Sequence, residues 1–297
     1  MSAPITAALA TCCLCSASAW GAPITFNTAL PVQTGGWVLR EQAIGLKLAD
    51  DPTAARRDLR VAGVVSVLGY GVTRDFALFG MLPWFDKRLD RRAGADGVRR
   101  RGRGLGDLTV LGRLTAYEHN APGQTVRVAP FAGIKAPTGR SRVRDRHGVL
   151  PPPLQPGSGA WDMLGGVVAT WQTLAVQFDG QLSYLAHGKA HGRRAGHVAR
   201  LDGSVQYRLW PRELSAGVPA FVYGVLEANL VHAARDRAGG RRDPDSGGTT
   251  LFLSPGLQYV TKRWIVEAGV QIPVAQRLNG NALGHDYGVT AGFRVNF

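Results

Sequence analysis

The stretch Gly288-Val-Thr-Ala-Gly-Phe-Arg-Val-Asn-Phe297 alternates strictly between two kinds of side chain. One parity is wholly apolar and comprises Val289, Ala291, Phe293, Val295 and Phe297; the other is polar or small and comprises Thr290, Gly292, Arg294 and Asn296. A period of two is that of a β-strand, whose successive side chains point to opposite faces. A last strand with an apolar face and a terminal aromatic is what a membrane barrel needs, because it must face lipid and pair with the first strand.

The amino-terminal residues point to export. Residues 1–19 are apolar or small and end in Ala17-Ser18-Ala19, which fits the small-x-small rule of a signal-peptidase site, although the first basic residue is Arg40. A buried helix and a lipoprotein signal ending at Cys12 are the alternatives. All three cysteines lie in this segment, so the mature chain would have no disulfide framework and no thiol ligand. We expect a cleaved signal peptide at 1–19, an N-terminal periplasmic segment at 20–34 and a single barrel domain at 35–297.

Alternating segments recur along the whole chain, each about as long as a tilted strand that crosses a bilayer. Counting back from the carboxyl end gives twelve expected strands, at 35–48, 59–72, 76–86, 105–118, 125–136, 160–172, 175–185, 197–209, 218–231, 249–261, 264–275 and 286–297. No run of about 18 apolar residues suggests a membrane helix. The alternative fold is a secreted β-sandwich or a lipocalin-like barrel.

The connections between these segments alternate in length. Short ones include 73–75 and 173–174, whereas long ones rich in Arg, Gly and Pro include 87–104, 137–159 and 232–248. With both termini periplasmic, short turns fall on the periplasmic side and long loops outside, as in bacterial barrels with an even strand number. We therefore expect an all-β, antiparallel, up-and-down transmembrane barrel. Aromatic residues at segment ends suit interface girdles, or else a core: Trp84, Trp161, Trp171, Tyr184, Tyr207, Tyr259 and Trp264.

The alternation also assigns residues to the lumen. The candidate lumen-lining residues are Asp107, Arg113, Arg127, Lys135, Asp179, Arg200, Asp202, Arg208, Glu227, Glu267, Gln271 and Arg294. Because both signs of charge share one wall, we expect part of this set to pair across a narrow lumen. Twelve strands give a barrel between the side-chain-filled eight-strand type and the wide sixteen-strand porins.

The formal net charge of +14 raises the question of a nucleic-acid partner. The basic residues instead cluster between the expected strands, with no recognised nucleic-acid module, so we expect no such partner. Outer-membrane lipid and lipopolysaccharide are the expected polyanions. The candidate contacts are Arg91, Arg92, Arg99, Arg100, Arg101, Arg140, Arg142 and Arg144.

Four motifs in order resemble a family of bacterial outer-membrane transporters, that of the MetA pathway of phenol degradation. They are Tyr70-Gly-Val-Thr-Arg-Asp-Phe-Ala-Leu78, Gly104-Leu-Gly-Asp-Leu-Thr109, Gly133-Ile-Lys-Ala-Pro-Thr-Gly139 and Gln155-Pro-Gly-Ser-Gly-Ala-Trp-Asp162. The resemblance implies an outer-membrane barrel that acts as a channel for small solutes, including hydrophobic or aromatic compounds. By resemblance to outer-membrane proteins generally, Phe297 is the assembly signal for the barrel-assembly machinery of a Gram-negative bacterium.

The sequence contains no convincing motif for a catalytic site or a metal site. No His and Ser lie two residues apart on one strand face as in outer-membrane phospholipase, and His285-Asp286 lacks the paired acids of an omptin-type protease. His187, Lys189 and His191 alternate and resemble a metal site, but they lack an acidic or thiol partner nearby in the sequence. We expect no enzyme, no cofactor and no metal. The two function hypotheses are a passive channel with a small-molecule permeant, and a non-conducting structural or adhesive barrel whose Arg-rich loops bind surface polyanions.

Overall fold

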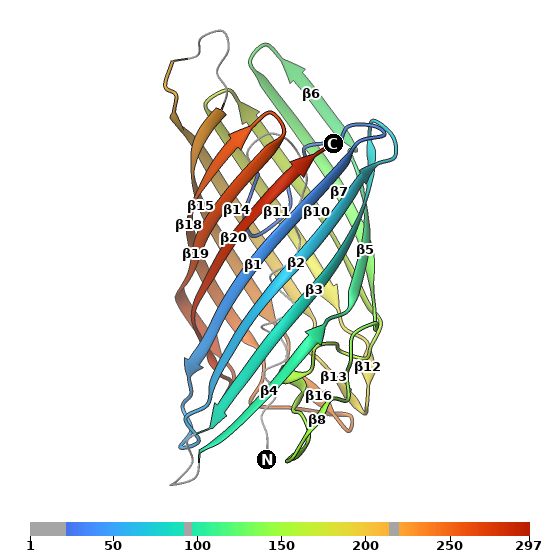
Figure 1. The fold of residues 1–297 in the computed structure, drawn as a ribbon, viewed down its shortest axis with the longest axis vertical. Helices are drawn as coiled ribbons and strands as arrows, with labels where there is room; N and C mark the ends of the chain where they lie inside the picture. Colours follow the sequence, from blue (N-terminus) through green and yellow to red (C-terminus); the bar gives the residue numbers. More distant parts are fainter. Residues whose placement is uncertain (1–21, 92–96, 214–219) are drawn as a thin grey trace.

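The computed structural model describes residues 22–91, 97–213 and 220–297; the expected signal peptide at 1–19 lies outside them. They form one closed antiparallel barrel with the twelve wall positions expected from the sequence (Figure 1). The wall strands are β1 (Trp37–Asp50), β2 (Asp58–Gly71), β3 (Phe76–Arg91), β5 (Leu108–Leu114), β7 (Gln124–Ala136), β10 (Asp162–Thr173), β11 (Val176–Ala186), β14 (Val198–Trp210), β15 (Ala220–Ala233), β18 (Gly248–Thr261), β19 (Trp264–Leu278) and β20 (Gly284–Asn296). No helix within the described ranges is long and apolar enough to cross a membrane.

The two ends of the barrel sequence close the wall. β1 pairs with β20 in a register that sets Ala43 opposite Ala291. Beyond the ladder, Trp37 and Phe297 exchange two backbone hydrogen bonds, of 2.7 and 3.0 Å between nitrogen and oxygen. The carboxyl-terminal strand that we expected to seal the barrel does so.

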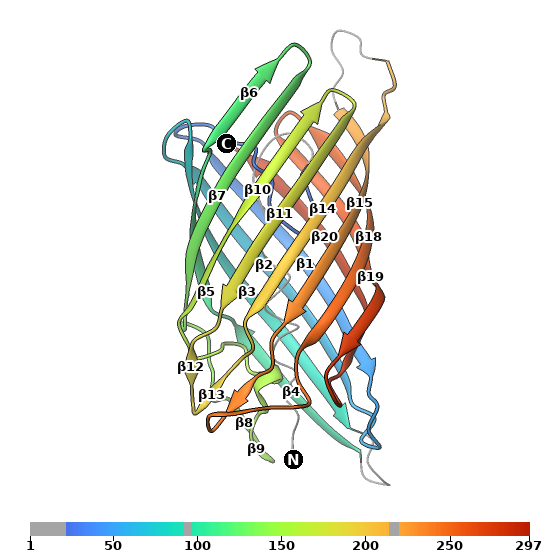
Figure 2. The same cartoon turned by 180° about the vertical axis from the view of Figure 1, so that it is seen from behind.

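The fourth wall position is divided into three strands. β4 (Val98–Leu105) pairs with β3, β5 pairs with both neighbours, and β6 (Tyr117–Ala121) pairs only with β7, beyond the short-turn end of the wall (Figure 2). The interruption follows Gly104, whose φ of +147° is open mainly to glycine. The expected single strand at 105–118 is therefore wrong in its bounds.

The expected outer loop at 87–104 is also wrong in part. β3 continues to Arg91 and β4 begins at Val98, so most of this basic segment is strand. The sequence pattern missed the extension because charged residues, and not apolar ones, occupy its outward face. The connections at 137–161, 187–197 and 234–247 carry short strands of their own: β8 (Arg144–Asp145), β9 (Gly148–Val149), β12 (Lys189–Ala190), β13 (Arg193–Arg194), β16 (Arg237–Ala238) and β17 (Arg241–Arg242).

The outward face of the wall is apolar between two aromatic zones. Leu68, Leu182, Leu201 and Leu257 are among its exposed side chains, and such a continuous apolar surface suits lipid. Trp171, Tyr207, Tyr259 and Trp264 lie at the short-turn end, whereas Trp84, Trp161 and Tyr184 lie toward the long loops. The exposure of these rings favours the girdle interpretation over the core one.

Residues 22–32, here called the lumen segment, lie inside the barrel. We expected residues 20–34 to be periplasmic, and the described part differs from that expectation. Residues 33–36 connect the segment to the start of β1 at the short-turn end of the barrel. Residues 22–30 are all buried. Nothing in the alternation of the strands indicates what fills their interior, so the position of the segment does not follow from that pattern.

Candidate functional site: the barrel lumen

The lumen wall has an apolar half. The apolar inward side chains of β2, β3, β5, β7 and the start of β10 form one buried cluster with Ala29 and Val32 of the lumen segment. Its members in the wall include Val61, Val65, Val67, Ala77, Phe79, Met81, Phe85, Leu111, Phe131 and Leu164. Inward positions of these strands thus carry the composition of a protein core, which is unusual for a water-filled channel.

The other half of the wall is polar. On β11 and β14, Asp179 accepts hydrogen bonds from Gln177 at 2.7 Å and from Gln206 at 3.1 Å. Farther along β14, the Arg200 guanidinium donates to Asp202 at 2.9 Å, and Asn229 of β15 donates to the same carboxylate at 2.9 Å. These groups are buried, and buried polar groups are stable only when they find such partners.

The ion pairs of the polar half lie within one strand or join strands that are adjacent or one strand apart in the wall. Glu267 of β19 receives hydrogen bonds from Arg40 of β1 and, at 3.0 Å, from Gln258 of β18, and lies 3.8 Å from Arg294 of β20. We expected part of the lumen charges to pair across the lumen. The pairs recorded for the described residues run along the wall, so they do not themselves block the passage.

What occupies the lumen is the lumen segment, held by side chains of the wall. Without strand pairing, its backbone groups need other partners inside the barrel. Glu227 accepts from the backbone nitrogens of Ile24 at 2.5 Å and Thr25 at 3.1 Å. The Ile24 carbonyl accepts from Arg40 at 2.8 Å and Gln42 at 2.9 Å.

The opposite wall completes this attachment. Arg113 donates to the carbonyl oxygens of Thr28 at 2.6 Å and Leu30 at 2.5 Å. Its guanidinium also lies 5.0 Å from the Phe79 ring centroid, a favourable contact between a cation and an aromatic face. Arg113 and Glu227, both predicted for the lumen, therefore bind the segment from two sides of the barrel.

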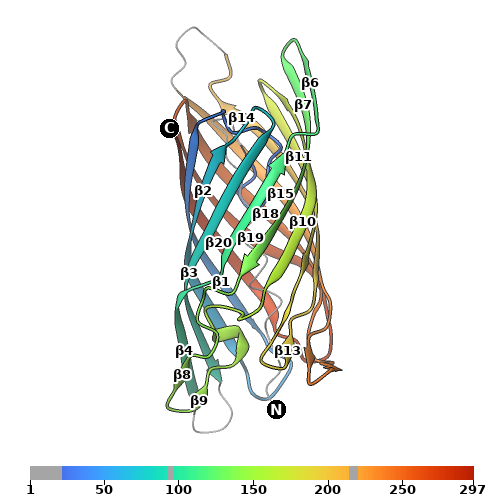
Figure 3. The ribbon, with the colours of Figure 1, turned by 90° about the vertical axis from the view of Figure 1, so that its right-hand side faces the viewer.

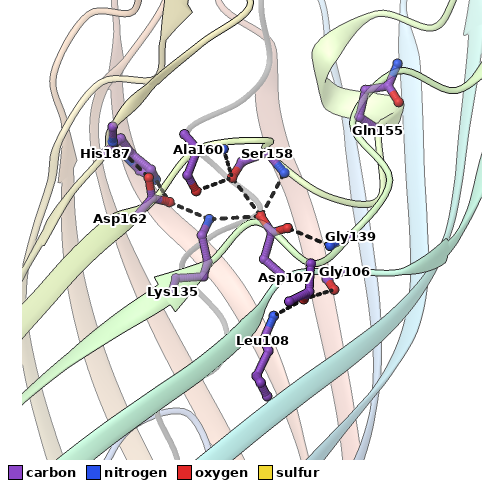
Figure 4. A network of polar contacts seen from close by, with 12 residues as sticks. Gly106, Asp107, Leu108, Lys135, Gly139, Gln155, Ser158, Ala160, Asp162 and His187 are labelled. Atoms are coloured by element: carbon purple, nitrogen blue, oxygen red, sulfur yellow. Dashed lines mark hydrogen bonds and ion pairs between the residues drawn. The ribbon is translucent and has the colours of Figure 1, made fainter.

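A second closure lies toward the long loops. Asp107 accepts from the Gly139 nitrogen at 3.0 Å and from the Ser158 nitrogen and hydroxyl at 2.7 and 2.6 Å (Figure 4). It thereby fixes both ends of the connection at 137–161, which carries the 3₁₀ helix Pro152–Leu154 and lies across this end of the lumen (Figure 3). Leu150 and Leu154 of the connection join the apolar cluster.

Charged side chains continue this network toward β10 and β11. The Lys135 ammonium lies 2.5 Å from an Asp162 oxygen and 3.7 Å from an Asp107 oxygen. His187, directly after β11, has Nε2 3.9 Å from the same Asp162 oxygen and Nδ1 2.8 Å from the Gly196 carbonyl. Burial lowers the pKa of His187, and the negative charge of Asp162 partly opposes that shift. We call Asp107, Lys135, Ser158, Asp162 and His187 the outer closure.

Three cavities follow one another along the barrel. A vestibule of about 450 Å³ opens among the long loops beside Arg100, Ser141 and Arg193, and one of about 680 Å³ opens at the short-turn end beside Val38, Arg127 and Asn296. Between them, a cavity of about 170 Å³ lies under the connection at 152–158. Its lining joins Val65, Met81, Phe85 and Leu164 of the apolar half to Lys135, Ser183 and Arg200.

The structure places the predicted lumen residues on inward positions, with different partners. Arg113 and Glu227 hold the lumen segment, and Asp107 and Lys135 belong to the outer closure. Asp179, Arg200, Asp202, Glu267 and Arg294 belong to the polar half. Gln271 donates to Asn229 at 3.3 Å, Arg127 pairs with Glu118 at 3.1 Å, and Arg208 donates to the Leu174 carbonyl at the short-turn end.

The predicted polyanion contacts divide into three groups. Arg99 and Arg101 project from the outer face of β4, and Arg140, Arg142 and Arg144 are exposed on the connection between β7 and β10. Arg100 turns inward and binds Asp145 at 2.7 Å, and Arg91 is half-buried at the end of β3. Arg92 lies outside the described residues.

Sequence reasoning missed several residues of the lumen. Arg40 and Gln42 were not chosen because the first strand alternates least clearly, although Val38, Arg40, Gln42 and Ile44 share one parity. Thr170, which donates to Asp179 at 2.5 Å and accepts from the Ala29 nitrogen at 2.8 Å, looks like an ordinary strand residue in the sequence. Among the described residues, no three His, Cys, Asp or Glu side chains gather as a metal site.

Comparison with solved structures identifies the architecture. An outer membrane channel from Pseudomonas putida aligns with a TM-score of 0.66 at 14% identity, over 91% of this chain and 97% of that one. The beta domain of the Bordetella autotransporter BrkA gives 0.47 at 13% identity, over 89% and 100%. The NanC porin gives 0.44 at 12% identity, over 86% and 98%.

Comparison with curated protein sequences gave no match. Residues 58–287 match the family described as "Putative MetA-pathway of phenol degradation". This range holds all four motifs on which the resemblance was based. The chain therefore belongs to the phenol-degradation MetA-pathway family.

Proposed function

We propose that this protein is an outer-membrane channel for small solutes that combine an aromatic or apolar body with a polar group. The observation that carries the proposal is the division of the lumen wall. A permeant in the central cavity touches Met81 and Phe85 on one side and Ser183 and Arg200 on the other. Ligand sites commonly join an apolar lining to a few polar groups in this way.

Cavity size narrows the class of permeant. The central cavity of about 170 Å³ is comparable to an apolar cavity of about 150 Å³ that accommodates benzene. A single-ring aromatic compound with a hydroxyl or carboxyl group is therefore the proposed permeant. The family description and the channel from Pseudomonas putida support transport as the function, with passive movement and no catalytic step.

Transport by this route requires two rearrangements. Residues 30–32 of the lumen segment line the short-turn vestibule, and the connection at 152–158 lines both the central cavity and the loop vestibule. Both are connecting or terminal segments held by side chains and not by the wall ladder. We propose that these two segments move aside during transport while the β-strand ladder of the wall stays intact. Export by a cleaved signal peptide in a Gram-negative bacterium belongs to the same proposal.

The test is solute flux through the full-length exported protein reconstituted in planar bilayers and liposomes. We expect conductance, and entry of a hydroxylated aromatic acid but not of a disaccharide. Ser183→Trp should fill the central cavity and reduce entry at least tenfold. Leu182→Trp is the matched control, because Leu182 is 57% exposed on the lipid face and its replacement should leave entry unchanged.

Two outcomes would contradict the proposal. The first is an absence of both conductance and solute entry from correctly folded protein. It would favour the structural or adhesive barrel, for which the occupied lumen is the supporting observation. The second is wild-type entry of the aromatic acid in Ser183→Trp, which would remove the central cavity from the route.

A further inference from the structure

Four cationic side chains form one row across β1, β2, β3 and β4, the adjacent strands at the front of Figure 1. The register places Lys47 opposite Arg60, Arg60 opposite Arg88, and Arg88 opposite Arg101. We call these four residues the cationic row. Strands lie about 4.8 Å apart, so the row spans about 14 Å. Like charges directly opposite one another destabilise a sheet, and an anion placed along the row would remove that repulsion.

The cationic row faces outward from the barrel. Relative exposure of the side chains is 61% for Arg60, 52% for Arg88 and 47% for Arg101. Lys47 is less exposed and lies 5.8 Å from the ring centroid of Tyr287. The row is thus part of the surface that meets the membrane, at its loop end, and does not contribute to the lumen.

The position of the cationic row along the membrane normal follows from its distance to the apolar outer surface of the same strands. Four residues farther along the same strands, Val64, Trp84 and Leu105 form a paired, outward and exposed apolar row. Four residues of tilted strand correspond to about 10 Å along the membrane normal. Because the headgroup layer begins where the hydrocarbon ends, the cationic row lies at the level of lipid phosphates.

Carboxylates in the patch do not neutralise it. Lys47 pairs with Asp286 at 2.5 Å, Arg60 with Asp58 at 3.2 Å, and Arg88 and Arg101 share Asp86. Arg99, with Asp90, and Arg103 extend the patch along β4 to six cations against four carboxylates. Arg103 has no ion-pair or hydrogen-bond partner among the described residues. Exposed ion pairs contribute little, so the arginines can exchange these partners for phosphate.

We propose that the cationic row binds the phosphate groups of lipopolysaccharide in the outer leaflet. Arginine presents a planar set of donors that matches phosphate oxygens, and three of the four residues are arginines. The row is long enough to contact more than one phosphate at once. Its place beside an exposed apolar surface suits a ligand whose phosphates are attached to acyl chains. This inference does not depend on what the lumen transports.

The experiment uses the full-length exported protein in detergent and measures binding of lipopolysaccharide to the folded barrel. The test variant is Arg60→Gln/Arg88→Gln/Arg101→Gln. The matched control is Arg140→Gln/Arg142→Gln/Arg144→Gln, which removes the same charge from exposed positions of the connection between β7 and β10, outside the cationic row. We expect at least tenfold weaker binding for the test variant, and less than a twofold change for the control.

A second measurement needs no variant. Wild-type protein should bind dephosphorylated lipopolysaccharide, and vesicles of phosphatidylglycerol, at least tenfold more weakly than intact lipopolysaccharide. Equal binding of the intact and dephosphorylated forms would overturn the proposal, as would unchanged binding by a folded test variant. Equal binding of phosphatidylglycerol would show a general attraction to anionic lipid and would overturn the assignment to lipopolysaccharide.

Discussion

The two halves of the lumen wall share one kind of outer surface and differ entirely inside. Leu68 on β2 and Leu201 on β14 face lipid in the same manner. The inward neighbours of Leu68 are Val67 and Gly69, whereas those of Leu201 are Arg200 and Asp202. The apolar half gains stability from close packing, and the polar half depends on each buried group finding a partner. The lipid face is thus alike around the barrel, whereas the inner face changes in chemistry from one half to the other.

The largest expected effect comes from detaching the lumen segment from both halves. Arg113→Met/Glu227→Gln removes the donor to Thr28 and Leu30 and the carboxylate that accepts from Ile24 and Thr25. We expect single-channel conductance to rise severalfold in planar bilayers, because the segment loses its attachment to β5 and its carboxylate acceptor on β15 and keeps only its remaining polar contacts. Glu118→Gln, on β6 and away from the segment, is the control. Unchanged conductance in the double variant would show that the segment does not limit ion flow.

Unfolding energies should differ between the halves. Phe79→Ala removes a ring from the apolar cluster and should lower the free energy of unfolding by about 3–5 kcal/mol. Ser254→Ala removes a 3.1 Å hydrogen bond to Asn229, which keeps its contact with Gln271, and should cost about 1 kcal/mol. Urea unfolding of the refolded barrel measures both. Equal losses would mean that the two halves are packed alike.

Acid should loosen the outer closure through His187. Burial, first of all, lowers the pKa of this histidine below its usual value of about 6.5; Lys135 and His197 act in the same direction, and Asp162 opposes them. Its contribution to stability is therefore complete above about pH 6.5 and is lost as the pH falls toward the lowered pKa. We expect faster protease cleavage of the connection at 137–161 at pH 5 than at pH 7.5. His187→Gln should remove most of this difference.

The smallest effect is expected at Asp145, which is half-buried in the connection between β7 and β10. The pKa of Asp145 is lowered to about 2, and the hydrogen bonds from Arg100 are the largest cause. The stabilisation of this pair is present above the ordinary pKa of about 3.9 and is lost only as the pH falls through about 2. Asp145→Asn should therefore leave the difference in cleavage rate between pH 5 and pH 7.5 as it is in the wild-type protein. A change as large as that caused by His187→Gln would show that the acid response depends on Asp145 and Arg100 as much as on His187.

The architecture was predictable because lipid imposes a strict rule on alternate residues. From Phe297 backward, the pattern gave the strand number, the placement of the long loops and the inward position of residues such as Glu227. It failed where no such rule acts. Charged outward residues concealed the ends of β3 and β4. The lumen segment escaped prediction because Glu227 and Arg113 meet it across sequence separations of 203 and 85 residues.

The hydrogen bonds between Trp37 and Phe297 have a consequence for biogenesis. They join residues at opposite ends of the barrel sequence, so the ring cannot close until β20 is available to pair with β1. Until then, β1 and β20 each present a row of unpaired backbone donors and acceptors, the feature that makes open sheet edges prone to aggregation. Contacts so distant in sequence also form slowly. The chain must therefore be kept apart from its neighbours in transit, and substitutions that hinder the pairing of β20 with β1 should delay closure more than they weaken the finished barrel.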